Sequence, residues 1–65
     1  MGHIGEAIRE ERRKQGYSAA FMASKLERPI TGQAFAQKEI NGRFSWNLVV
    51  EVAKILEKDL DYFYK

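Results

Sequence analysis

Amide side chains recur between residues 31 and 41, and their hydrogen-bonding groups match the edges of nucleic-acid bases. Drawn as a helix, this segment places five residues, none of them acidic, on one side: Gln33, Ala34, Gln37, Lys38 and Asn41. An amide can pair with N6 and N7 of adenine, a lysine reaches guanine O6 and N7 or a phosphate, and a methyl group contacts thymine. This side therefore fits a base-contacting surface, and an ordinary solvated helix face is the alternative.

The other polar residues give little basis for catalysis or metal binding. The 65 residues include no cysteine and a single histidine, His3, for which the pattern offers no partner. Acidic residues cluster only at Glu10-Glu11 and Asp59-Asp61, where a charged helix face and a helix cap explain them. The glycines are isolated and form no phosphate-binding loop. We expect no enzymatic activity, no cofactor, no metal and no small-molecule ligand.

Basic residues are concentrated in one part of the chain. The net charge is +2, but residues 12–43 hold seven basic and two acidic residues, a local charge of +5, whereas residues 44–65 have −1. This distribution favours a surface that faces a polyanion, with ordinary surface charge as the alternative. No apolar run approaches the roughly 18 residues of a membrane span, and no secretory signal opens the chain. We expect a cytoplasmic protein without a membrane partner.

Short helices account for the apolar periodicity along the whole chain. Ser18, Thr31 and Ser45 are suited to begin helices, and Gly16 and Gly42 to end them. Five helices are expected, at 4–15, from 19 to no later than 28, from 32 to about 41, at 46–57 and at 60–64. No segment alternates as a half-buried strand does. Residues 1–3 are expected to be a disordered or expression-derived end, and residues 4–65 one all-α domain.

The third helix must also present an apolar side to the core. Its expected inward stripe comprises Gly32, Phe35, Ala36, Glu39 and Ile40. A carboxylate on this stripe needs a partner, because an unpaired charge is costly inside a protein. Arg12 lies one turn beyond Ile8, an apolar position of the first helix. The sequence therefore predicts an ion pair between Arg12 and Glu39.

Several short segments follow one another in a familiar order. They are Ile8-Arg9-Glu10, Arg12, Gly16-Tyr17-Ser18, Met22-Ala23, Lys25-Leu26, Glu39, Gly42, Ser45, Leu48 to Val50, Val52-Ala53-Lys54, Leu56, Leu60-Asp61 and Phe63. Together they resemble the lambda-repressor-like, Xre-type helix-turn-helix family over residues 4–64. The resemblance implies a compact five-helix DNA-binding domain whose third helix enters the major groove, usually as a symmetric dimer. It also implies the Arg12–Glu39 pair, and it makes Ala23 the small residue where the second and third helices cross.

The chain departs from the family pattern after the second helix. Glu27 stands where relatives usually have a glycine, and the spacing from Leu26 to Glu39 is longer than usual. Because the usual tight turn needs a left-handed glycine, we expect a longer connection over residues 27–30 with Ile30 as its buried anchor. Ala19 replaces a glutamine that often contacts phosphate, and Lys38 stands at a position that is often aliphatic.

On this interpretation the chain is a sequence-specific transcriptional regulator, most simply a repressor, that binds double-stranded DNA. Base contacts are expected from Thr31, Gly32, Gln33, Ala34, Gln37 and Lys38. Phosphate contacts are expected from Ser18, Lys25, Arg28, Asn41 and Arg43. A homodimer is expected to form through Trp46, Tyr62, Phe63 and Tyr64, with the alternative that some of these aromatic residues fill the small core. Phe21 is open between core, partner and DNA-backbone contact. The alternative is a helix-turn-helix protein-interaction module, antitoxin-like or accessory, that does not recognise DNA sequence.

Overall fold

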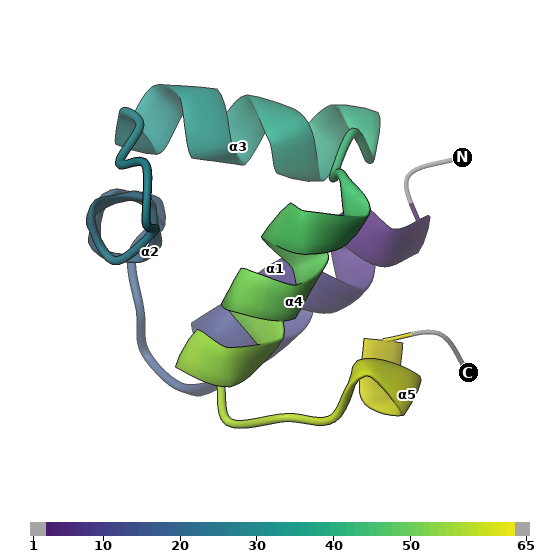
Figure 1. Cartoon of the computed structure of the whole chain (residues 1–65). Coiled ribbons are helices and arrows are strands. Elements are labelled where there is room, and N and C mark those ends of the chain that lie inside the picture. Colours follow the sequence, from purple (N-terminus) through teal and green to yellow (C-terminus); the bar gives the residue numbers. More distant parts are fainter. Residues whose placement is uncertain (1–2, 64–65) are drawn as a thin grey trace.

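The computed structural model describes residues 3–63, which contain five α-helices joined by short connections (Figure 1). They are α1 (His3–Lys14), α2 (Ala19–Ser24), α3 (Gly32–Asn41), α4 (Trp46–Ile55) and α5 (Leu60–Phe63). In the view of Figure 1, α3 lies across the top, α2 lies below its first turn, and α4 lies in front of α1. The predicted all-α class is confirmed, and the described range holds no strand.

Three helices begin at hydroxyl residues, as predicted. In each case the side-chain oxygen accepts a hydrogen bond from the backbone N–H three residues later, which satisfies one otherwise unpaired donor of the first turn. Ser18 caps α2 at 3.0 Å, Thr31 caps α3 at 3.0 Å and Ser45 caps α4 at 3.3 Å. These caps depend on neighbouring residues only, which is why the sequence locates them.

The helix ends agree less closely with the sequence. α1 and α3 end before Gly16 and Gly42, whose φ angles of 81° and 69° are left-handed, as expected. α4 stops at Ile55 rather than at Glu57, because Glu57 itself adopts a left-handed φ of 57°. The N–H of Lys58 then bonds the carbonyl of Ala53 at 2.9 Å, which closes the helix. No glycine marks this end in the sequence, so the prediction extended too far.

Every helix contributes at least one side chain to a single core. Its buried residues are Ile8, Met22, Ala23, Leu26, Phe35, Val52, Ala53, Leu56 and Phe63. A chain of this length often needs disulfides or a metal to stay folded. Here all five helices bury apolar side chains in one shared core. The stabilisation from this burial takes the place of a disulfide or a metal.

A buried carboxylate joins α1 to the C-terminal segment. The Tyr62 hydroxyl donates a hydrogen bond to Glu11 Oε1 at 2.6 Å, and the Gln15 amide donates to Oε2 at 2.7 Å. The same amide also donates to the carbonyl of Leu56 at 2.8 Å. The two hydrogen bonds, from Tyr62 first and then Gln15, lower the pKa of Glu11, with a smaller contribution from the charge of Lys58. The network keeps the short α5 in place.

Candidate nucleic-acid interface

The outer side of α3 is a polar surface with one exposed apolar residue. Gln33, Gln37 and Asn41 are exposed, and Ala34 is half-buried between them. The only acidic residue of the helix, Glu39, is buried on the opposite side. The predicted amide-bearing, carboxylate-free side is therefore present at the surface, with its centre at Gln37.

The residues of α3 that face the core differ from those of the predicted inward stripe. Phe35 and Glu39 are buried, but Ile40 is 67% exposed, so its placement in the core was wrong. At 3.6 residues per turn, positions 35 and 40 lie about 140° apart around the axis, and one helix face cannot bury both. Phe35 takes the core position, and this rotates Ile40 outward. The five-residue spacing between the two residues was the signal that could have shown that only one of them is buried.

The predicted ion pair between Arg12 and Glu39 is confirmed. Arg12 Nε donates to Glu39 Oε2 at 2.8 Å and Nη2 donates to Oε1 at 3.0 Å, a two-pronged geometry typical of strong arginine–carboxylate pairs. The third donor, Nη1, bonds the carbonyl of Tyr17 at 2.8 Å. The side chains of Arg12 and Glu39 are only 10% and 2% exposed. One guanidinium thus connects α1, the end of α3 and the segment that leads into α2.

Two glycines allow α3 to approach its neighbours closely. A Cβ on Gly5 would overlap the backbone carbonyl of Glu39, so α1 passes directly against the end of α3. A Cβ on Gly32 would lie 2.8 Å from Ala20 Cα, so α2 and α3 pack closely against each other at this pair. The sequence instead assigned the crossing to Ala23, whose side chain is buried in the core. Gly32 was predicted to let α3 approach DNA closely, and in the structure it lets α3 pack closely against Ala20 of α2.

The connection between α2 and α3 is the longer turn expected from Glu27. Within residues 3–63 positive φ occurs only at Gly16, Gly42 and Glu57, so this connection contains no left-handed residue. The N–H of Glu27 bonds Glu51 Oε1 of α4 at 2.8 Å, and the N–H of Ile30 bonds the carbonyl of Ala23 at 3.3 Å. Ile30 is half-buried against the core, as predicted for its anchor.

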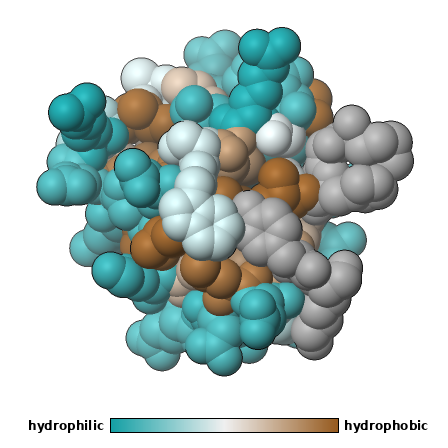
Figure 2. Space-filling model, turned by 45° about the vertical axis from the view of Figure 1, so that its right-hand side comes forward, coloured by the Kyte–Doolittle hydropathy of each residue, from teal (hydrophilic) through white to brown (hydrophobic). Residues whose placement is uncertain are grey.

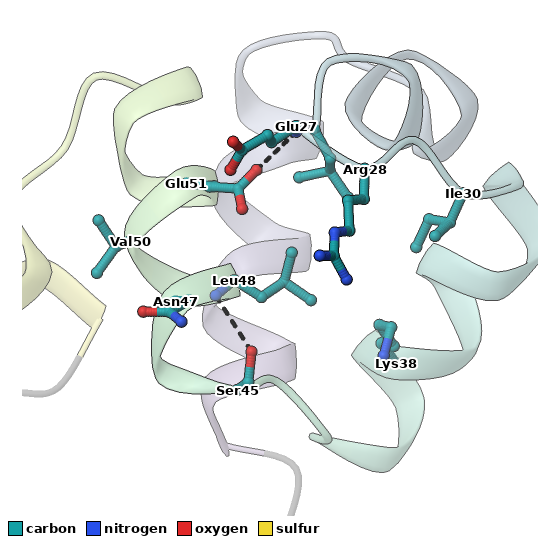
Figure 3. Close-up of a pocket in the computed structure, with 10 residues that line it drawn as sticks. Glu27, Arg28, Ile30, Lys38, Ser45, Asn47, Leu48, Val50 and Glu51 are labelled. Atoms are coloured by element: carbon teal, nitrogen blue, oxygen red, sulfur yellow. Dashed lines mark hydrogen bonds between the residues drawn. The ribbon is translucent and has the colours of Figure 1, made fainter.

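A groove of about 610 Å³ lies between this turn, α3 and α4 (Figure 3). Figure 3 shows the Arg28 side chain extending from the turn into the groove, with Ile30 and Lys38 on one side and Leu48 on the other. Lys38 is half-buried there, toward α4 rather than at the centre of the exposed side of α3. The groove therefore places two cations beside the amide-bearing surface.

The residues predicted to contact phosphate surround this surface unevenly. Lys25, Arg28, Asn41 and Arg43 are exposed, and the Ser18 oxygen caps α2.

Phe21 is 37% exposed, which excludes a core position. Its ring stacks on Tyr17 with centroids 4.6 Å apart, and Lys25 Nζ lies 5.3 Å from its centroid. Tyr17, Phe21 and Lys25 thus form an aromatic and cationic row along α2.

The aromatic residues predicted for a dimer interface have different positions. Trp46 is 61% exposed at the first turn of α4. Phe63 is buried in the core, which removes it from any exposed surface, and Tyr62 is half-buried with its hydroxyl bonded to Glu11. Tyr64 lies outside the described residues. Figure 2 shows the side of the molecule that carries α5, where several hydrophobic residues reach the surface between hydrophilic ones.

Comparison of the chain with protein-family models, with curated proteins and with solved structures finds no match. None of the helices in residues 3–63 has the length and apolar character to cross a membrane. Within the same range, no three histidine, cysteine, aspartate or glutamate side chains lie close enough to hold a metal ion.

Proposed function

We propose that this chain is a sequence-specific DNA-binding transcriptional regulator with a lambda-repressor-like fold. In this proposal α2 and α3 form the helix-turn-helix, and the exposed side of α3 enters the major groove. The observation that carries it is the exposed surface of Gln33, Gln37 and Asn41 on a helix whose only carboxylate is buried and paired. The amides of Gln33 and Gln37 can pair with adenine, Asn41 at the end of the helix can contact a phosphate, and the missing negative charge removes repulsion from the phosphates.

Cations beside this surface support contact with the DNA backbone. Arg28 and Arg43 are exposed on the two connections that flank α3, and Lys38 lies in the groove next to Arg28. Phosphate contacts supply much of the affinity of DNA-binding proteins and make it dependent on salt. These cations position the protein, and the amides of α3 select the sequence.

The first experiment is selection of bound sequences from a random duplex pool, followed by fluorescence anisotropy at several salt concentrations. We expect an enriched motif and an affinity that falls steeply as salt rises. Arg43→Ala should reduce the slope of log Kd against log salt by about one counterion. Arg9→Ala is the matched control, because Arg9 is also an exposed arginine but lies on α1, and it should leave the slope unchanged. Absence of salt-sensitive binding to any duplex would refute the proposal.

Exposed aromatic residues favour a second candidate, a helix-turn-helix protein-interaction module. Trp46 and Phe21 are both large side chains at the surface, and aromatic residues are enriched at protein interfaces. In the first proposal the surface near α5 and Trp46 instead serves a homodimer, whose half-sites would lie about 10 base pairs apart. Spacing in the selected motif distinguishes the two, since an interaction module yields no motif and a dimer yields a repeated one.

A further inference from the structure

Ile40 is the large apolar residue that α3 exposes most. It is 67% exposed and follows Gln37 by three residues, so the two side chains lie on neighbouring positions of the same helix surface. Gln37 is the middle residue of the row of exposed amides Gln33, Gln37 and Asn41, so Ile40 lies at the edge of that row. An isoleucine at this position contributes nothing to the core, which Phe35 already fills.

We propose that Ile40 is a specificity-determining residue that contacts the C5-methyl group of a thymine. This inference rests on the proposed DNA binding by α3 and adds the base class that its surface selects. The thymine methyl is the one apolar group that a base pair presents in the major groove, and an aliphatic side chain is its natural partner. The amides beside Ile40 match adenine, the base that pairs with thymine. The surface as a whole therefore favours A·T pairs.

Helix geometry places the contacts of Gln37 and Ile40 close together on the duplex. With a rise of 1.5 Å per residue, Ile40 lies about 4.5 Å along the axis from Gln37. This separation is short enough for the two side chains to contact the same base pair or neighbouring base pairs. The base pair contacted by Ile40 is therefore expected to be the one contacted by Gln37 or its neighbour, at the edge of the half-site nearer the C-terminal end of α3.

The test compares thymine with deoxyuridine, which lacks only the methyl group. The full chain is titrated against the best duplex from the selection, and each thymine is replaced in turn by deoxyuridine. One replacement should weaken binding about fourfold, as expected for the loss of one buried methyl group. Ile40→Ala should bind the thymine duplex more weakly and lose this discrimination. Because Ile40 is exposed, the variant should retain the helical circular dichroism of the parent.

Phe21→Ala is the control, because it also removes an exposed apolar side chain but from α2. It should leave the ratio of the two dissociation constants unchanged. Equal affinity for thymine and deoxyuridine at every position would overturn the inference while leaving DNA binding intact. Discrimination that persists in Ile40→Ala would assign the methyl contact to another residue. A change in oligomeric state without a change in the ratio would make Ile40 an interface residue and overturn it too.

Discussion

Replacing Glu39 with glutamine tests the ion pair that fixes the end of α3. The substitution keeps the shape of the side chain but removes its charge, so the guanidinium of Arg12 stays buried without a counterion. Glutamine can accept one of the two hydrogen bonds that Glu39 accepts, and the bond from Arg12 to Tyr17 is untouched. Breaking a buried pair at one partner typically costs about 3–5 kcal/mol, and we expect a loss near the lower end, about 3 kcal/mol.

This loss is large compared with the total stability of so short a chain. At about 0.05–0.15 kcal/mol per residue, a domain of this size has a free energy of unfolding of roughly 3–10 kcal/mol. Urea unfolding followed by circular dichroism at 222 nm should show a lower midpoint with an unchanged slope. Glu10→Gln, an exposed carboxylate of α1, is the matched control and should change stability by less than about 0.5 kcal/mol.

A double variant separates pairing from burial. Arg12→Met with Glu39→Met removes both charges and fills the space with apolar atoms, which is often neutral or stabilising for buried pairs. It should therefore be more stable than either single methionine variant, with a coupling of at least about 1 kcal/mol. A loss below about 1 kcal/mol for Glu39→Gln, or additive single effects, would refute the argument that this pair is buried and coupled.

Three further predictions concern packing, a helix end and pH. Gly5→Ala should lower the thermal midpoint, because the clash with the backbone of α3 costs about 1–3 kcal/mol and outweighs the gain of about 1 kcal/mol in helix propensity; a higher midpoint would disprove the close approach. Glu57→Gly should stabilise the chain by about 1 kcal/mol in urea unfolding, since glycine adopts the left-handed conformation without strain, and destabilisation would contradict this. The pKa of Glu11 is lowered in the fold, so its contribution to stability is present above its ordinary value of 4.5 and is lost as pH falls through the folded pKa. Tyr62→Phe should weaken this acid dependence in thermal melts between pH 6 and pH 3 relative to the parent chain, and an unchanged dependence would count against the Tyr62–Glu11 hydrogen bond.

Local signals in the sequence predicted most of the fold. Ser18, Thr31 and Ser45 begin helices through bonds to residues three positions away, and Gly16 and Gly42 end them through their own conformation. Such features involve no tertiary partner, so a single sequence contains them. The ion pair of Arg12 with Glu39 was predictable for a different reason, because burying one charge demands another.

The predictions that were wrong concern residues whose burial is decided by tertiary packing. The sequence offers Phe35 and Ile40 as equally apolar, and only the space beneath α3 selects Phe35. Phe63 was assigned to an interface because its neighbours are aromatic, yet the core takes it. The close approaches at Gly5 and Gly32 were missed as packing features, since their partners are distant backbone atoms. The exposure of the amide side chains of α3 was therefore predicted correctly. The direction in which the helix faces the core was not, because Ile40 is exposed and Lys38 is half-buried.

The two ends of α3 are attached by residues that do not belong to its exposed side. Gly32 contacts Ala20 at the first turn, and Glu39 bonds Arg12 at the last. The outward positions, by contrast, make no contribution to these attachments. Substitutions at Gln33, Gln37 or Ile40 should therefore cost little stability, and under the proposed function they would change the DNA sequence that the helix selects. The residues that hold α3 in the fold are thus separate from those that it presents to solvent, so the two sets can change independently during evolution.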